Sequence, residues 1–140
     1  MIDLRESQRV KALLENSPEN FEQIIEETSL AICVTNQHGN YSAVNENYLR
    51  LYGYERDEMI GASFLIVVPE DDQDRLQDLH DIFMKLKDEI MRNWEVKNKD
   101  GHTFTISADA GFSPDIMGQP HKVTFIWPDD ESDQRRMRER

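Results

Sequence analysis

The chain has 140 residues and a formal net charge of −12, with 38% hydrophobic and 31% charged residues, which is typical of one soluble globular domain with a core of its own. Nucleic acids are bound mainly through Lys and Arg that neutralise phosphates, so this acidic balance argues against nucleic-acid binding. No apolar run approaches the roughly 20 residues that cross a bilayer, and the charged N-terminal stretch lacks the apolar segment of a secretory signal, so we expect a cytoplasmic protein that makes no contact with membranes.

The N-terminal residues predict an amphipathic helix followed by a second, shorter helix. The first helix spans residues 3–14. Its partial apolar stripe consists of Leu4, Val10, Leu13 and Leu14. Ser17 and Pro18 begin the next helix, because proline suits a first helical turn, and this helix runs to about Thr28. The first helix needs a covering surface, which is either the domain's own sheet or a second copy of the chain.

A β-hairpin and a helix cap are predicted directly after these helices. The apolar residues Ile32 and Val34 alternate with less apolar ones, which indicates a half-buried strand. Gly39 supplies the turn to a second strand, because glycine adopts positive φ at little cost. Asn45 then offers its side-chain oxygen to the free N–H groups of a helix over residues 46–52.

A long helix and three further strands complete the predicted fold. The helix covers about residues 72–92 and follows several short helical turns. Its apolar face consists of Leu76, Leu79, Phe83, Leu86 and Ile90. The predicted strands lie at about 94–97, 104–112 and 123–127. Glycine-containing turns at 97–102 and 113–120 join these strands.

Alternation along the last two strands assigns their side chains to two sheet faces. One face of the first strand carries Phe104, Ile106, Ala108, Ala110 and Phe112. Because Ala108 and Ala110 are small and oppose the long helix, they leave space for large helix side chains or for a ligand. The candidate cavity is lined by Leu79, His80, Phe83, Phe104, Ile106, Ala108 and Ala110. Ile126 is expected on the face opposite Phe125, turned outward against the N-terminal helix.

Five pieces of the chain, taken in order, resemble the PAS domain family. They are AICVTNQHGNYSAVN, YLRLYGYERDEMIG, FLIVVPEDD, WEVKNKDGHTFTI and DIMG, within about residues 21–132. The resemblance implies an α+β fold whose five-stranded antiparallel sheet has the order 2-1-5-4-3, with helices on one face, to which this chain adds an N-terminal helix. The expected division is an N-terminal helix (1–17), a PAS domain (18–132) and an Arg-rich tail or start of a linker helix (133–140).

PAS domains bind haem, flavins, small acids or nothing, so the resemblance leaves the cofactor open. His80 lies on the long helix, where haem-binding relatives place an axial ligand, but a boundary histidine is the simpler interpretation. Relatives that form a flavin–cysteinyl adduct carry its cysteine before this helix, and the comparable stretch 61–72 has none. Cys33 is instead interpreted as a packing residue of the first strand. No catalytic or metal-binding motif is found in the sequence.

We therefore expect a non-enzymatic regulatory module of bacterial signal transduction, which is either a fragment of a larger protein such as a sensor kinase or a cyclase, or acts by binding. The module would sense a small ligand or relay a signal to an output domain or partner protein. The alternative is a ligand-free module for homodimerisation or docking. Its interface would consist of Leu4, Val10, Leu13, Leu14 and Ile126.

Overall fold

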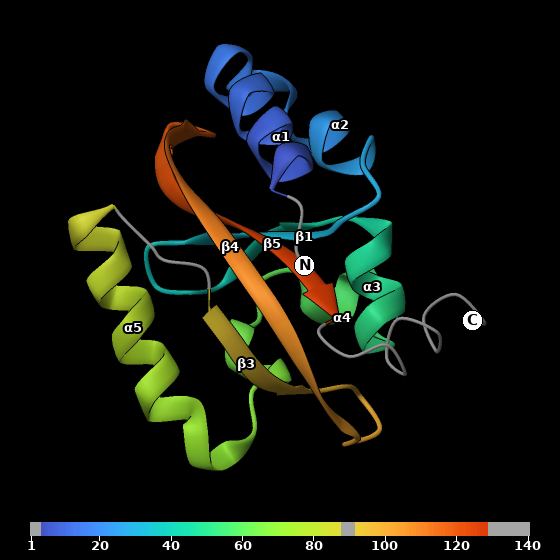
Figure 1. Cartoon of the computed structure of the whole chain (residues 1–140). Coiled ribbons are helices and arrows are strands. Elements are labelled where there is room, and N and C mark those ends of the chain that lie inside the picture. Colours follow the sequence, from blue (N-terminus) through green and yellow to red (C-terminus); the bar gives the residue numbers. More distant parts are fainter. Residues whose placement is uncertain (1–3, 88–91, 129–140) are drawn as a thin grey trace.

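A five-stranded antiparallel sheet forms the centre of the computed structural model, which describes residues 4–87 and 92–128 (Figure 1). The strands are β1 (Ala31–Asn36), β2 (Tyr41–Val44), β3 (Arg92–Lys97), β4 (Thr103–Ile116) and β5 (Gln119–Pro128). Their order in the sheet is β2-β1-β5-β4-β3. This order confirms the predicted fold class.

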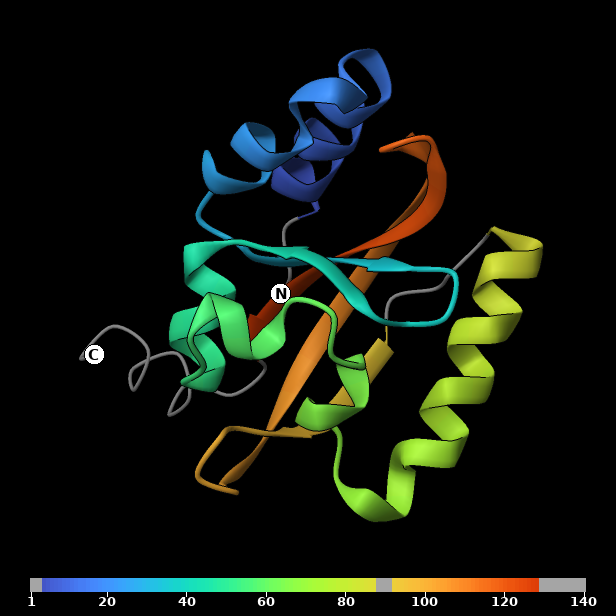
Figure 2. The same ribbon diagram turned by 180° about the vertical axis from the view of Figure 1, so that it is seen from behind.

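Helices cover both faces of the sheet. They are α1 (Arg5–Asn16), α2 (Phe21–Glu26), α3 (Glu46–Tyr52), α4 (Arg56–Met59) and α5 (Gln73–Leu86), with the 3-10 turns η1 (Pro18–Asn20), η2 (Phe64–Val67) and η3 (Glu70–Asp72). Side chains of α3, α4 and η2 belong to one buried cluster, and those of α1 and α2 belong to another. We call the first the inner face and the second the outer face. Figure 2 shows α3, α4 and η2 on the side nearer the viewer.

The outer face buries part of the apolar stripe of α1. Val10 and Leu14 are 0% and 4% exposed, and they belong to the same cluster as Phe125 of β5. The domain's own sheet therefore covers α1, which is one of the two covering surfaces considered from the sequence. Leu4 and Leu13 remain 38% and 40% exposed.

The outward orientation predicted for Ile126 is wrong. Ile126 is buried in the inner cluster with Ala108, whereas Phe125 belongs to the outer cluster, and Lys11 of α1 lies over its ring at 5.7 Å. Alternation correctly separates Phe125 from Ile126, because successive strand residues point to opposite faces. The alternation does not say which face α1 will cover, and the larger aromatic side chain meets α1 instead.

The helix predicted over residues 72–92 is shorter in the structure. α5 ends at Leu86, where Lys87 follows with a left-handed φ of 62° that stops the helical hydrogen bonding. Arg92, the last residue of the predicted helix, already begins β3. Ile90 and the tail at 133–140 lie outside the described residues.

α5 is also less covered than its apolar pattern predicts. Its buried side chains are His80 and Phe83. Ile82 and Leu86 are 50% and 70% exposed. The helix runs along one side of the sheet (Figure 1), and the space between them is a cavity described below.

β4 and β5 meet in a tighter turn than the one predicted over 113–120. β4 continues to Ile116, and β5 already begins at Gln119. Met117 and Gly118 form the turn with φ values of 54° and 76°, as two-residue type I′ hairpins require. Ile116 is fully buried in the outer cluster, and this burial outweighs the turn tendency of the polar residues before it.

Candidate ligand cavity

A cavity of about 80 Å³ lies on the inner face between the sheet and α5. Its walls come from β1, β3, β4 and β5, and from α3, η2 and α5. Most of the lining is apolar. Its polar side chains include Cys33, Thr35, Tyr52, His80, Lys122 and Thr124. The cavity therefore combines an apolar body with a few polar groups, which is the usual composition of a small-molecule site.

Strand alternation brings these side chains to one surface. On β5, Lys122, Thr124 and Ile126 line the cavity, while the intervening Val123 and Phe125 belong to the outer cluster. β1 and β4 contribute alternate residues in the same way. The residues of the sheet that line the cavity are thus decided by the twofold period of the strands.

The structure brings part of the predicted lining set together. The predicted residues that border the cavity are His80, Ile106 and Ala108. The predicted residues that lie outside its lining are Leu79, Phe83, Phe104 and Ala110. Phe83 packs beside Phe112 with ring centroids 6.4 Å apart, and Phe104 packs beside Tyr52 at 5.8 Å. Of the two, Phe104 packs against the inner cluster.

His80 ties α5 to the β1–β2 hairpin. Its Nε2 lies 3.0 Å from the carbonyl oxygen of Asn36, so this nitrogen carries the hydrogen and donates it. The ring packs beside Phe64 with centroids 5.5 Å apart. Burial, and then the nearby charge of Lys122, lower the pKa of His80 from its ordinary value, which favours the neutral ring.

Haem and flavin do not fit the cavity as it is packed. Pockets for drug-sized ligands measure about 300–1,000 Å³, and both cofactors are at least drug-sized, whereas this cavity measures about 80 Å³. The Nε2 atom of His80 is already engaged with a backbone carbonyl. The geometry therefore gives no support to His80 as a haem ligand.

Tyrosine side chains form a buried row next to the cavity. The hydroxyl oxygens of Tyr41 and Tyr48 lie 2.5 Å apart, and the rings of Tyr48 and Tyr52 follow with centroids 4.7 Å apart. The Tyr52 hydroxyl is buried and has no hydrogen-bond partner among the described residues. Burial raises the pKa of Tyr52 well above its ordinary value, so the hydroxyl keeps its proton and remains a donor.

Cys33 is a buried member of the inner cluster and also borders the cavity. Burial raises the pKa of its thiol to about 11. Because the thiolate is the reactive form of cysteine, a protonated thiol here is a packing group rather than a nucleophile.

Several polar lining residues were not predicted from the sequence. They include Thr35 on β1 and Lys122 and Thr124 on β5. The predicted faces of β5 are reversed in the structure, and no face was predicted for β1. The signal for Lys122 and Thr124 is the twofold period of β5, in which both alternate with apolar residues. Tyr52 left no such signal, because its place depends on how α3 packs against the sheet.

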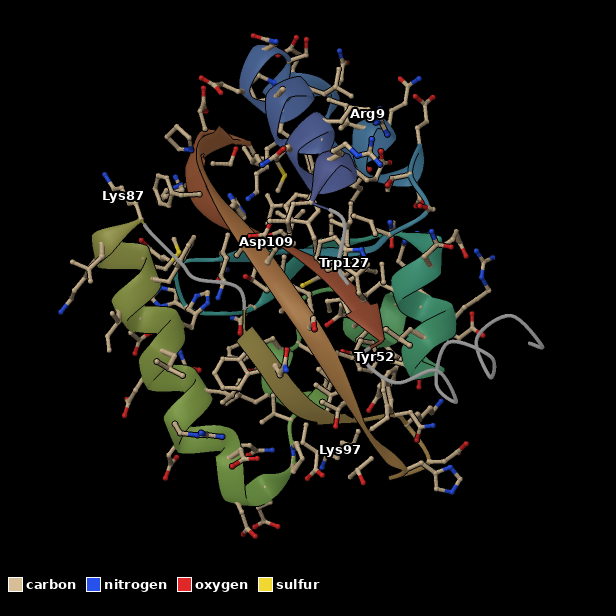
Figure 3. All side chains as sticks on the ribbon, in the orientation of Figure 1. Arg9, Tyr52, Lys87, Lys97, Asp109 and Trp127 are labelled. Atoms are coloured by element: carbon tan, nitrogen blue, oxygen red, sulfur yellow. The ribbon has the colours of Figure 1, made fainter. Side chains whose placement is uncertain are left out.

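A buried carboxylate lies on the outer face, directly behind the cavity wall. Asp109 follows Ala108 on β4 and lies below the N-terminal half of α1 (Figure 3). Its Oδ2 accepts a hydrogen bond from Ser7 Oγ at 3.0 Å and lies 2.9 Å from Lys11 Nζ. Asp109 therefore faces α1 rather than solvent.

Within residues 4–87 and 92–128, no helix is both long and apolar enough to cross a bilayer. In the same residues, no three His, Cys, Asp or Glu side chains gather in a group that would hold a metal ion.

A family model described as PAS fold matches residues 19–129 of the chain. The chain is also similar to the PAS domain of an HTR-like protein from Haloarcula marismortui. The two are 19% identical, the match covers 87% of this chain and 99% of that chain, and the TM-score is 0.63. No curated protein matches the sequence.

Two further solved structures have the same fold. A PAS domain from a two-component sensor histidine kinase is 16% identical, with 82% of this chain and 98% of that chain covered and a TM-score of 0.66. Drosophila melanogaster Cycle PAS-B with bound ethylene glycol is 13% identical, with 71% and 99% covered and a TM-score of 0.61.

Proposed function

The chain belongs to the PAS family of signal-transduction sensor domains, and from this premise we propose that its inner cavity senses a small oxygen-bearing molecule. The sensed state would reach an output domain or a partner protein through the outer face of the sheet. Two features support this function. One is the hydroxyl of Tyr52, a residue that lines the cavity, which has no hydrogen-bond partner in the part of the chain that the structure describes. The other is the contact between β4 and α1 behind the cavity wall.

The Tyr52 hydroxyl carries the argument for a ligand. A buried polar group without a partner costs about 1–3 kcal/mol, and native proteins rarely leave such groups unsatisfied. Tyr52 is 0% exposed and borders the cavity. A water molecule or a ligand oxygen in the cavity would accept its hydrogen bond, with Thr35 and Thr124 as further polar neighbours.

The volume of the cavity limits the ligand to a few heavy atoms. A cavity of about 80 Å³ corresponds to the liquid volume of roughly three water molecules at about 30 Å³ each. Short diols and short carboxylic acids satisfy this limit, and Lys122 in the wall favours the acids. Ethylene glycol, which occupies the fold relative Cycle PAS-B, is of this size.

Replacing Tyr52 with phenylalanine tests the ligand site. We expect the variant to bind short diols or acids about fivefold more weakly, because one hydrogen bond of roughly 1 kcal/mol is lost. The unliganded variant should be as stable as the unmodified protein or slightly more so, since the unsatisfied hydroxyl is gone. Ethylene glycol, glycerol and acetate would be titrated while the amide NMR signals of Thr35 and Thr124 are followed.

The matched control for this test is Tyr54→Phe, which removes a hydroxyl from a half-buried tyrosine outside the cavity lining. It should leave the titration curves unchanged. Saturable shifts that are the same in Tyr52→Phe and in the unmodified protein would contradict the proposed role of the hydroxyl. The absence of saturable shifts with all three probes would contradict sensing of this ligand class.

A homodimer built on α1 is the second candidate function. Leu13 is 40% exposed, whereas Val10 and Leu14 of the same helix are buried against the sheet. Such a dimer would therefore use the outward side of α1 and leave the stripe in place. We expect Leu13→Glu to give a monomer mass by light scattering if α1 is the contact. The same mass before and after the substitution would contradict an α1-mediated dimer.

A further inference from the structure

We propose that Ser42 is an acyl acceptor, activated by His121, that takes a short apolar acyl group from an activated ester. The site lies on the outer side of the molecule, between α2, β2, α4 and the turn from β4 to β5. Within residues 4–87 and 92–128, it shares no lining residue with the ligand cavity on the inner face. The proposal is therefore independent of the sensory function.

The two side chains form a hydrogen-bonded pair. Ser42 Oγ lies 3.0 Å from His121 Nε2, although the residues are 79 positions apart in the chain. The second ring nitrogen, His121 Nδ1, lies 3.0 Å from the carbonyl oxygen of Gln119. Nucleophile, base and an orienting group thus follow one another at hydrogen-bond distance, which is the arrangement that activates serine hydroxyls.

The carbonyl of Gln119 decides the direction of both hydrogen bonds. A carbonyl oxygen can only accept, so Nδ1 of His121 carries the hydrogen of the neutral imidazole. Nε2 then presents its lone pair, and the Ser42 hydroxyl donates to it. This tautomer is the one that a general base needs in order to take the serine proton. His121 is 2% exposed, so its ring is held in place by the surrounding packing.

A pocket of about 310 Å³ opens next to Ser42. Its apolar lining includes Phe21, Ile25, Ile60 and Met117, of which Ile60 and Met117 are 42% and 61% exposed. The charged residues Glu22, Glu26 and Arg56 also line it. An acyl chain of a few carbons would pack against the apolar part of this lining. Because Ser42 is half-buried and belongs to the lining, an ester bound in the pocket would lie within reach of its hydroxyl.

The proposed step balances without any further reactant. The Ser42 oxygen attacks the ester carbonyl carbon while His121 Nε2 removes the hydroxyl proton, and an oxygen–carbon bond forms. The bond from the carbonyl carbon to the leaving alkoxide or phenoxide breaks, and the imidazolium returns its proton to that leaving group. The products are acyl-Ser42 and one alcohol or phenol. The proposal concerns this acylation alone.

The test uses p-nitrophenyl butyrate on the intact folded chain. Addition of one butyryl group would be followed by mass spectrometry, and the modified residue would be identified by peptide mapping. We expect Ser42 to be acylated about 100-fold faster than the exposed Ser29, since general base catalysis contributes about 10²–10⁴-fold. His121→Gln keeps hydrogen-bonding groups at this position but removes the base, so it should lower the Ser42 rate to that of Ser29.

Two further measurements keep the test decisive. Should His121→Gln fail to fold, the unmodified chain in urea takes its place, and Ser42 should lose its rate advantage over Ser29 upon unfolding. Ile60→Asp places a charge at the pocket edge, and it should slow acylation by the butyryl ester more than by the acetyl ester. If Ser42 in the folded chain reacts no faster than Ser29, or if folded His121→Gln reacts as fast as the unmodified chain, the pair is only a structural link between β2 and the β4–β5 hairpin.

Discussion

Replacing Asn45 with alanine is expected to lower the free energy of unfolding by about 4 kcal/mol, because four buried hydrogen bonds of roughly 1 kcal/mol each are lost together. Asn45 is 0% exposed, so water cannot replace the lost partners without entering the core. Small domains are stable by about 5–15 kcal/mol in total. A large share of the folded population would therefore be lost in mild denaturant.

The expected loss of stability is large because Asn45 joins separate elements by hydrogen bonds to their backbones. Its Oδ1 accepts hydrogen bonds from the N–H groups of Ile32 on β1 (3.0 Å) and Tyr48 on α3 (2.9 Å). Its Nδ2 donates to the carbonyl oxygens of Ile25 on α2 (2.7 Å) and Leu30 before β1 (2.9 Å). Alanine would remove the side-chain partner of two backbone N–H groups and of the Ile25 carbonyl, while the Leu30 carbonyl would keep its hydrogen bond from Asn47.

Urea unfolding followed by circular dichroism measures this loss. Asn47→Ala is the matched control, because Asn47 is half-buried and its amide donates to the carbonyl oxygens of Thr28 and Leu30. The control should cost about 1 kcal/mol, since solvent can reach the groups it leaves behind. Equal losses for the two variants would show that Asn45 is an ordinary helix cap and not a junction between elements.

Replacing Asp109 with alanine is expected to cost about 2 kcal/mol and to loosen α1 from the sheet. Removing one partner of a buried ion pair costs about 3–5 kcal/mol, but the Lys11 side chain is 34% exposed and can return to water. Without Asp109, the Ser7 hydroxyl can donate to the carbonyl oxygen of Leu4, which lies 3.1 Å from Ser7 Oγ. Both facts place the expected loss below that of a fully buried pair.

Asp109→Asn separates the charge from the hydrogen bond at this contact. Its amide oxygen still accepts from Ser7, but the ion pair with Lys11 is gone, so we expect about half the loss of the alanine variant, or roughly 1 kcal/mol. The exposed Asp115 lies farther along the same strand, and Asp115→Ala should change stability by less than about 0.5 kcal/mol.

Hydrogen exchange of the α1 amides reports on the same contact directly. If Asp109 holds α1, the amides of α1 should exchange faster in Asp109→Ala while those of β1 and β5 keep their protection. Uniformly faster exchange across the chain would mean that the substitution acts on global stability alone. Unchanged exchange in α1 would contradict the role of Asp109 in holding the helix, and with it the proposed route from the cavity through β4.

Short-range features of the fold could be predicted from the sequence alone. The turn at Gly39 has the expected positive φ of 87°, and Asn45 caps α3 as expected, with its side chain accepting from Tyr48 N. The alternation along β4 also placed Ile106 and Ala108 together on one face, and both line the cavity. These features depend on one residue's backbone preference or on the period of one strand, and both are written in adjacent residues.

Features that depend on two elements meeting were decided only by the tertiary structure. Ile126 faces the cavity rather than α1, since the period of a strand separates its two faces without assigning either one to a partner. Ser7 contacts Asp109 across 102 positions, and Ser42 contacts His121 across 79. Such hydrogen bonds leave no periodic pattern in the sequence. Donor and acceptor reach bonding distance and orientation only after folding has brought two strands, or a helix and a strand, together.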